Sequence, residues 1–285
     1  MLHAPTLPGG HGMVLYDPGM DRVRAWKPAI AGIREVLHAE FTEHAYPRHT
    51  HDDWTVFIVD AGAIRYGLDR RENEAPNALV SILPPGVAHD GRPASAGGYR
   101  KRVLYVDTSV LPESLIGPAV DRPAVPDPRL AADVAALHDA LACVDDRLDA
   151  EARFADVADR IRASFEPEAV GSAGSSGAGR DVAGASAAEA LRGYLDAHLF
   201  ENVALADAAN VTGWSVSRLA CAFRTRFGMT PHAYVTGRRL DAARDRILAG
   251  QSLSDVAAEV GFCDQAHLTR RFRQFLATTP GRFAA

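Results

Sequence analysis

Residues 205–283 contain the same pattern twice. LADAANVTGWSVSRLACAFRTRFGMTP begins at Leu205, and LSDVAAEVGFCDQAHLTRRFRQFLATTP begins at Leu253. Early matches such as Gly213 with Gly261 are 48 residues apart, and later ones such as Pro231 with Pro280 are 49 apart. The two copies therefore predict the same structural unit, with one additional residue in the turn of the second.

Each copy predicts two short helices around a tight turn. Leu, Ala and Val recur at helical spacing, a Gly-aromatic pair interrupts them, and a second amphipathic segment follows. Ser252 and Asp255 have the spacing of a capping box, which begins a helix. Thr230-Pro231 places an N-cap before a proline at the first helical position. The helix from Pro231 to about Ala249 then joins two helix-turn-helix units.

The second helix of each unit has a small and basic outer face. Leu268, Phe272 and Phe275 recur at i, i+4 and i+7, and Leu219 and Phe223 do the same in the first copy, so these residues predict the buried stripe. Small residues let a helix approach DNA, and arginine can donate two hydrogen bonds to guanine. The alternative is a pair of ordinary solvated helices, which the duplication disfavours. The predicted DNA contacts are Ser217, Arg218, Cys221, Arg224, Gln265, Ala266, His267, Arg270 and Arg273.

These motifs resemble the DNA-binding domain of the AraC/XylS family of transcriptional regulators. The resemblance rests on Gly228-x-x-Pro231, Gly261-Phe262, the run DQAHLTRRF and Thr279-Pro280, and it covers about the last third of the chain. It implies two recognition helices that enter successive major-groove segments of double-stranded promoter DNA, about 34 Å apart. RNA polymerase is then the implied protein partner.

The chain departs from this family at two positions. Cys221 stands where members often carry a base-reading polar or basic residue, which puts the specificity of the first copy in doubt. Ala277 replaces the usual glycine after the last recognition helix. If its backbone is left-handed, the cost is up to about 1 kcal/mol.

The region from Ile33 to Asp107 predicts a β-sandwich or barrel. IREVLHAEF, WTVFIVDAGAIRYGL, ALVSILPPG and RKRVLYVDT are β-branched or aromatic runs separated by turn residues. The preceding residues, from Met1 to about Pro28, predict an arm with a short strand around Met13–Tyr16.

Two histidine motifs in this region resemble the signature of the cupin double-stranded β-helix, which also forms the sensory half of many AraC/XylS regulators. They are His49-x-His51 and Pro84-x-Gly86-x-x-His89; Thr55 stands where metal-binding cupins carry a glutamate. Neutral imidazoles at His49, His51 and His89 can still hold Zn²⁺, Fe²⁺ or Ni²⁺ with an open position. The favoured alternative is a pocket without metal for a small-molecule effector. The predicted effector contacts are His49, His51, Trp54, Tyr66, His89 and Tyr105.

Helical patterns follow the strands and lead to a linker. They run from Leu111 to Ile116, from Asp127-Pro128 to about Leu148, and from Asp149 to Phe165. In the resembling regulators such helices form the interface of a homodimer; the alternative is that they only cap the barrel. The Gly/Ser/Ala-rich stretch at 167–185 predicts a flexible linker between a domain at 1–166 and a DNA-binding domain at 186–285. The expected fold class is α+β multidomain: a cupin-like barrel with a helical C-terminal part, then an all-α domain.

Charge and cysteine usage agree with an intracellular DNA binder. Residues 186–285 carry 12 Arg, no Lys and 9 acidic residues, a formal charge of +3, against −8 for the remainder. Three cysteines without metal-ligand spacing suit a reducing cytoplasm, and neither a signal pattern nor a membrane-spanning run is present. We therefore expect an effector-responsive, sequence-specific regulator that is not an enzyme and needs no cofactor beyond that metal. The alternative is a metal-dependent cupin enzyme with an accessory DNA-binding domain.

Overall fold

Strands whose side chains alternate between two faces, most of them between positions 33 and 106, form two antiparallel sheets. The computed structural model describes residues 21–77, 79–142, 147–165, 182–202 and 204–284. In these residues one sheet has the strand order β1-β2-β9-β4-β7-β10, and the other has the order β3-β8-β5-β6. The strands are β1 (Arg22–Trp26), β2 (Ile33–Phe41), β3 (Tyr46–His49), β4 (Trp54–Gly62), β5 (Ile64–Leu68), β6 (Arg71–Ala75), β7 (Val80–Leu83), β8 (His89–Pro93), β9 (Tyr99–Val106) and β10 (Ala124–Val125).

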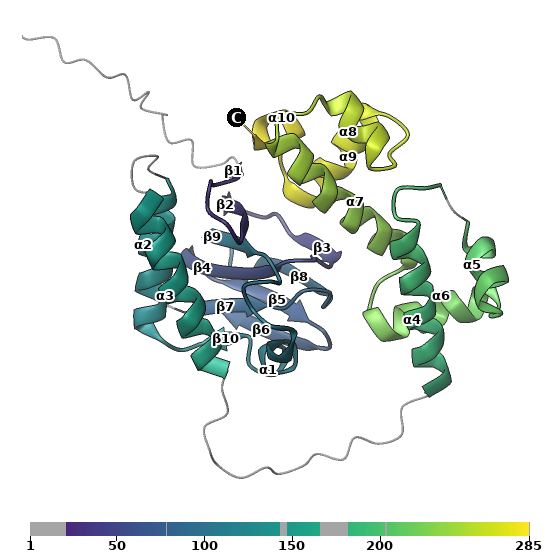
Figure 1. Ribbon diagram of the computed structural model, residues 1–285, viewed down its shortest axis with the longest axis horizontal. Helices are drawn as coiled ribbons and strands as arrows, with labels where there is room; N and C mark the ends of the chain where they lie inside the picture. Colours follow the sequence, from purple (N-terminus) through teal and green to yellow (C-terminus); the bar gives the residue numbers. More distant parts are fainter. Residues whose placement is uncertain (1–20, 78, 143–146, 166–181, 203, 285) are drawn as a thin grey trace, which may run out of the picture.

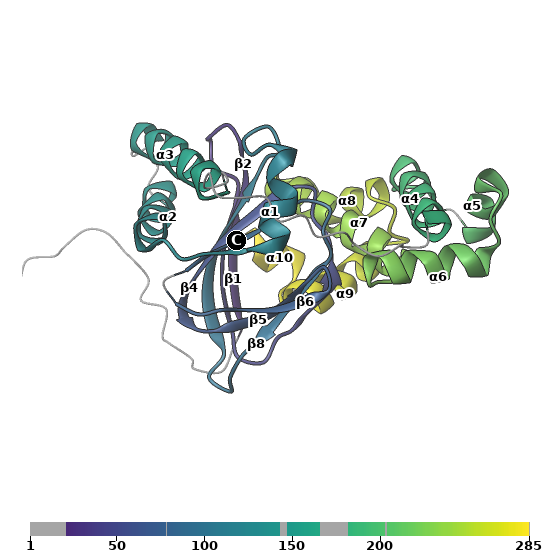
Figure 2. The ribbon, with the colours of Figure 1, turned by 90° about the horizontal axis from the view of Figure 1, so that it is seen from below.

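The four predicted strand runs are confirmed, and β1, β3, β6, β8 and β10 lie outside them. IREVLHAEF is β2 over its whole length, and the other three runs contain β4, β5, β7 and β9. Strand β1 lies inside the predicted arm and pairs antiparallel with β2, from Arg22 opposite Glu40 to Trp26 opposite Val36. The strand predicted around Met13–Tyr16 lies outside the described residues. The two sheets face each other (Figure 2), as the cupin-like expectation requires.

The larger sheet buries apolar side chains on both faces, because side chains along a strand alternate in direction. On its inner face Leu37, Phe41 and Phe57 pack against Ile64 and Tyr66 of the smaller sheet. The outer face packs against helices α1 (Ile116–Asp121), α2 (Pro128–Leu141) and α3 (Arg147–Phe165). Figure 1 shows α2 and α3 lying side by side along this sheet.

Helix α2 begins at the predicted cap and ends earlier than predicted. The Asp127 carboxylate accepts a 2.8 Å hydrogen bond from the Arg129 backbone N–H, and Pro128 occupies the first helical position. The helix ends at Leu141, seven residues before the expected end near Leu148, and a separate helix begins at Arg147. The periodic apolar pattern continues past Leu141, so the pattern alone does not predict where this helix ends. Near the expected Leu111–Ile116 helix, the chain forms a 3₁₀ turn at Glu113–Leu115 and then α1.

The C-terminal region has the two predicted helix-turn-helix units. The first consists of α5 (Leu205–Thr212) and α6 (Val216–Phe227), and the second of α8 (Leu253–Glu259) and α9 (Gln265–Leu276). The long helix α7 (Pro231–Leu248) joins them (Figure 1), and α10 (Pro280–Phe283) ends the described chain. The Thr230 and Ser252 hydroxyls cap α7 and α8, as predicted. None of the described helices is long and apolar enough to cross a membrane.

The helix that opens the C-terminal domain begins before the predicted boundary. Helix α4 runs from Val182 to Ala197, so residues 182–185, expected in the linker, are helical. The small residues of this stretch include alanines, which favour helix where packing supports it. The rest of the predicted linker, up to residue 181, lies outside the described residues.

The buried apolar residues of the C-terminal domain belong to two separate clusters. The first helix-turn-helix unit packs around Leu219, Phe223 and Tyr234 with Leu191 of α4. The second unit, around Phe272, belongs to the same apolar cluster as the inner face of the barrel. The boundary between cores thus falls along α7 and not at the predicted linker.

The left-handed backbone expected at Ala277 is present. Its φ is 54° and it ends α9, at the position that Gly228, with φ 69°, holds after α6 in the first copy. We expect Ala277→Gly to raise the free energy of unfolding by about 0.5–1 kcal/mol, because glycine adopts this conformation without a Cβ clash. Urea unfolding measures the change. Ala258→Gly, on the exposed side of α8, is the matched control and is expected to lower stability by a similar amount. A loss of stability on Ala277→Gly would contradict the prediction.

Candidate functional site

The outer faces of α6 and α9 are exposed, and their inner faces are buried as predicted. Leu219, Phe223, Leu268 and Phe272 are fully buried. All the predicted DNA contacts are exposed except His267, which is partly buried. The exposed set is Ser217, Arg218, Cys221, Arg224, Gln265, Ala266, Arg270 and Arg273.

The first turn of each recognition helix is fixed by a side-chain cap. The Asp264 carboxylate accepts the His267 backbone N–H at 2.6 Å, and the Ser215 hydroxyl accepts that of Arg218 at 3.3 Å. The Arg218 guanidinium stacks over the Trp214 ring at 3.9 Å, which holds its charge beside the turn. Both helix starts are thus rigid enough to present side chains to a groove.

His49, His51 and His89 form a compact buried cluster at one end of the barrel. One ring nitrogen from each lies within 4.8 Å of those of the other two, and the side chains are 5–7% exposed. His49 ends β3, His89 begins β8, and these two residues are opposite each other in the sheet register. The sheet pairing therefore brings together the two motifs that are forty residues apart in sequence.

Each imidazole of the cluster has its Nδ1 atom facing a hydrogen-bond acceptor. His49 Nδ1 lies 2.6 Å from the Pro47 carbonyl oxygen, and His89 Nδ1 lies 3.0 Å from that of Val87. His51 Nδ1 lies 2.8 Å from the Asp241 carboxylate. A carbonyl or carboxylate oxygen only accepts, so each Nδ1 carries a proton, and in a neutral ring the Nε2 atom then has the free lone pair. The Nε2 atoms of His49 and His51 are 3.1 Å apart.

The environment keeps the His49 and His89 imidazoles neutral. Burial lowers the pKa of His49 well below its ordinary value, and the neighbouring His89 and His51 lower it further. Burial also lowers the pKa of His89 to about 3. Neutral imidazoles with Nε2 lone pairs are the form that ligates divalent transition metals. The three nitrogens could hold such an ion, whereas Thr55 offers no carboxylate.

The other predicted effector residues are divided between two faces. Tyr105 lies against the histidines, with its ring centre 5.1 Å from that of His51. Tyr66 is buried within the barrel beside Phe57. Trp54 lies on the opposite face of the larger sheet, where its Nε1–H donates to the Leu111 carbonyl at 2.9 Å. Its expected place in the effector pocket is therefore incorrect.

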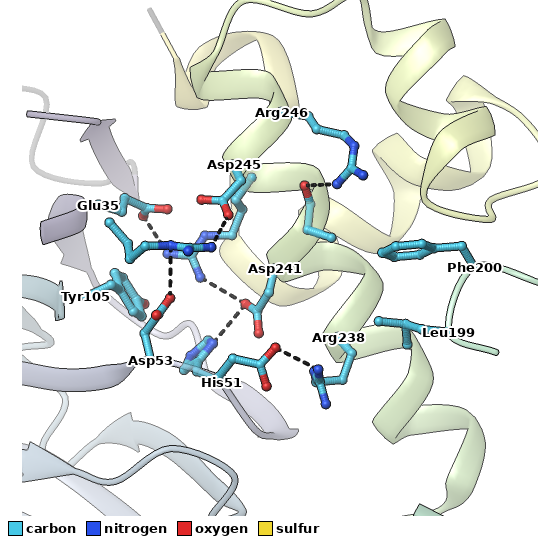
Figure 3. Close-up of a pocket in the computed structure, with 14 residues that line it drawn as sticks. Glu35, His51, Asp53, Tyr105, Leu199, Phe200, Arg238, Asp241, Asp245 and Arg246 are labelled. Carbon is cyan, nitrogen blue, oxygen red and sulfur yellow. Dashed lines mark hydrogen bonds and ion pairs between the residues drawn. The ribbon is translucent and has the colours of Figure 1, made fainter. Parts of the chain in front are cut away.

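Helix α7 covers the histidine cluster. Gly237, Asp241 and Arg244 are spaced to share one helix face, and a Cβ at Gly237 would lie 3.4 Å from the His49 Cβ. Figure 3 shows Asp241 pointing from α7 to His51. Burial opposes ionisation of Asp241, but His51 and Arg244 lower its pKa below the ordinary value.

A buried ion pair joins the same face of α7 to the barrel. Arg244 donates to the Glu35 carboxylate of β2 at 2.5 Å, and both side chains are only 5% exposed. The Arg244 guanidinium also lies over the Tyr105 ring, 4.4 Å from its centre. Burial opposes the charge of Arg244, but Glu35 and Tyr105 raise its pKa well above the ordinary value. Arg244 is thus a permanently charged group that Glu35 compensates.

More exposed ion pairs surround this contact and line a cleft between the domains. Arg34 pairs with Asp245 at 2.7 Å, and Arg238 pairs with Asp52 at 2.6 Å. The cleft has a volume of about 340 Å³, and its walls come from β2, the loop before β4, and α7 (Figure 3). Both carboxylates and guanidinium groups face it, so a polar molecule that offers donors and acceptors fits its chemistry.

The residues of this junction were absent from the sequence prediction. Glu35 offered a signal, because it shares the inward alternation of β2 with Leu37 and Ala39 and so places an acid on an apolar face. Asp241 and Arg244 offered none, since charged residues on a long helix usually face solvent. Their partner is distant in sequence, and only the docked fold identifies it.

Two family models match the chain. They are an AraC-like ligand binding domain over residues 32–158 and a helix-turn-helix domain over residues 208–285. The chain is similar to the probable transcriptional regulator LumQ of Photobacterium leiognathi, with 33% identity over 91 residues, which is 32% of this chain and 37% of LumQ. It is also similar to the uncharacterized HTH-type transcriptional regulator YbfI of Bacillus subtilis, with 36% identity over 75 residues, 26% of this chain and 27% of YbfI. The chain thus matches well under half the length of these curated relatives.

Solved structures show a similar fold over most of the chain. An apo variant of ToxT from Vibrio cholerae has a TM-score of 0.52 at 12% identity, with 92% of this chain and 95% of that chain covered. A second ToxT structure has a TM-score of 0.51 at 11% identity, with 93% and 99% covered. At this identity the likeness concerns the fold, a β-barrel followed by a helical domain.

Proposed function

The chain belongs to the AraC family of regulators, and from that premise we propose that it is a sequence-specific transcriptional regulator controlled by a small-molecule effector. The observation that supports this most directly is the duplicated recognition surface. The outer faces of α6 and α9 are both exposed, while α7, which joins them, docks on the barrel with its Arg244 face. Most of the recognition surface therefore stays exposed while α7 is docked, although Arg70 of the barrel donates to the Thr225 carbonyl of α6.

The contacts of the two recognition helices differ in kind. Arg270 lies in the middle of α9 beside the small Ala266, which suits a bidentate contact to guanine O6 and N7. Arg224 and Arg273 lie nearer the ends of α6 and α9, which suits phosphate contacts. Cys221 and Ser217 on α6 offer fewer hydrogen bonds, so we assign more of the sequence specificity to α9.

An effector acts, in this proposal, on the contact between the two domains. The cleft above His51 and Tyr105 is lined from both halves, so an occupant distinguishes the docked from the undocked arrangement. A ligand shifts such an equilibrium only by its difference in affinity for the two arrangements. The polar lining favours a small polar effector.

The remaining partners follow from the same proposal. Promoter DNA, RNA polymerase and a second copy of this chain are its macromolecular partners, and the cytoplasm is its place of action. In the described residues the exposed large apolar side chains are Phe200, Val211 and Val216, none of which lies on α2 or α3. A homodimer through these two helices would therefore rest mainly on polar contacts.

The alternative of a metal-dependent enzyme is less well supported. A substrate must reach the metal, and the three histidines are almost fully buried beneath Asp241 and Gly237 of α7. A buried cluster of this kind suits a sensor or structural role better than turnover.

The test of the proposed function is selection of bound sequences from random duplex DNA, followed by affinity measurements with Arg270→Ala. We expect a motif that spans two successive major-groove segments. Arg270→Ala is expected to weaken binding to that motif by about 1–3 kcal/mol and to relax one position of it, because a bidentate guanine contact is lost.

Arg273→Ala serves as the matched control from the same helix. It is expected to weaken binding to specific and random DNA alike and to reduce the salt dependence, as loss of a phosphate contact does. Equal losses on both DNAs with Arg270→Ala would show that Arg270 contacts phosphate. A complete lack of sequence preference, with and without small-molecule extracts, would contradict the proposed function.

A further inference from the structure

The Nε2 atoms of the histidine cluster are arranged for a cation. Backbone carbonyls hold the Nδ1 protons of His49 and His89, so the Nε2 atoms of both present lone pairs to the centre of the cluster. The Nε2 atoms of His49 and His51 are 3.1 Å apart, a hydrogen-bonding distance at which one proton lies between them. A metal ion bound by these nitrogens, about 2.0–2.1 Å from each in the case of zinc, would replace that proton, and the three histidines are close enough to share it.

The third imidazole has an acceptor from the other domain. His51 Nδ1 donates to the Asp241 carboxylate, and Asp241 lies on α7, 190 residues later in the chain. A carboxylate in this position fixes the tautomer of a metal-ligating histidine, orients its ring and increases its basicity. The barrel therefore supplies the ligands, and the DNA-binding domain supplies the group that supports one of them.

We propose that His49, His51 and His89 bind a divalent transition metal ion, and that the Asp241–His51 hydrogen bond couples its binding to the docking of α7 on the barrel. The coupling rests on the proposed function, because it makes the metal a regulator of the DNA-binding domain. It requires no further group: the metal withdraws electron density from His51, and its Nδ1–H becomes a stronger donor to Asp241.

The coupling is reciprocal by thermodynamic necessity. If docking supplies Asp241 and thereby increases metal affinity, bound metal increases the docked population by the same factor. Loss of a supporting carboxylate of this kind typically lowers metal affinity about 10–100-fold. The metal therefore favours the arrangement in which the DNA-binding domain rests on the barrel.

The experiment uses the full chain, freed of metal with a chelator and titrated with Co²⁺, whose visible absorption reports coordination, and then with Zn²⁺ in competition. We expect one metal ion per chain. Asp241→Asn is expected to lower the affinity about 10–100-fold, with a Co²⁺ spectrum that still shows three nitrogen ligands. Glu259→Gln is the control, because Glu259 of α8 pairs with Arg246 inside the DNA-binding domain and with no residue of the barrel or histidine cluster among the described contacts. Its metal affinity is expected to stay close to that of the unaltered chain.

Hydrogen exchange of the backbone from Tyr46 to Trp54, beneath α7, measures docking in the same samples. Zn²⁺ is expected to slow this exchange in the unaltered chain and in Glu259→Gln, and to have little effect in Asp241→Asn. Failure to take up either metal overturns the site. Equal metal affinity in Asp241→Asn and the unaltered chain, or uptake without a change in exchange, overturns the coupling. Each of these results leaves the DNA selection with Arg270→Ala unaffected, so the inference and the proposed function fail separately.

Discussion

Glu35→Ala is expected to weaken the docking of the DNA-binding domain on the barrel by about 3–5 kcal/mol. Glu35 is the buried partner of Arg244, and each side chain is only 5% exposed. Without the carboxylate, Arg244 keeps its charge in a buried position with only the more distant Asp241, at 3.3 Å, to compensate it, and undocking is the simplest way to hydrate it. The expected loss corresponds to a decrease of at least about a hundredfold in the ratio of docked to undocked molecules.

Hydrogen exchange over β2, β3 and the beginning of β4 measures this loss. Asp52→Ala is the matched control, because it breaks the contact of Asp52 with Arg238 at the edge of the same interface. The Asp52 side chain is 64% exposed, and exposed pairs contribute about 0–1 kcal/mol, so little change is expected. A double variant, Glu35→Leu with Arg244→Met, is expected to recover much of the docking, since it removes both members of the buried pair and leaves Asp241 with His51. Unchanged protection in Glu35→Ala would show that the pair does not hold the domains together.

Phe272→Ala is expected to lower the stability of the barrel as well as that of the second helix-turn-helix unit. The Phe272 ring is fully buried and packs edge-to-face on Phe283, with their centres 5.1 Å apart. Truncation of such a ring costs about 3–5 kcal/mol. The cluster that contains Phe272 continues through Phe275 to His49 and the inner face of the sheets, so part of the loss is expected in the barrel.

Phe223→Ala is the matched substitution in the first unit. Phe223 is equally buried, but it belongs to the separate cluster of α4, α6 and Tyr234, in which Ala88 is the one buried residue from the barrel among the described residues. Its effect is expected to fall mainly within residues 182–235. Segment-resolved hydrogen exchange in increasing denaturant distinguishes the two patterns. If both variants destabilise the barrel equally, or neither does, the two apolar clusters that meet along α7 do not unfold as separate cooperative units.

The helices and strands could be predicted where local pattern decides them. The duplicated units, α7 and β2 have strong periodicity with capping or turn residues at their ends, and the structure has them within a few residues. Ala277 drew attention because it replaces the glycine that the family usually has, and its φ of 54° matches the left-handed backbone of Gly228 in the first copy. The ends of α2 and α4 were predicted less well, because packing selects among helix ends that the sequence permits.

The sequence predicted only the part of the candidate site that lies within the barrel. The histidine motifs identified the cluster, whereas the charged face of α7 was found only in the structure. Trp54 was placed in the pocket by composition alone. Thr55, the next residue, stands where metal-binding cupins carry a ligating glutamate, and adjacent residues on a strand point to opposite faces. Trp54 accordingly lies on the face of the sheet away from the histidines.

Helix α7 sets a fixed distance between the two recognition units. Its 18 residues form an uninterrupted helix of about 27 Å, which has the scale of one turn of DNA. Because this spacer is stiff, the spacing of the two half-sites in an operator matters as much as their base sequence. Half-sites moved apart by half a turn would lie on opposite sides of the duplex, where a straight rod cannot bring both α6 and α9 into the grooves. A change in spacing alone would then prevent simultaneous binding of both helices to an operator in which every contacted base is retained.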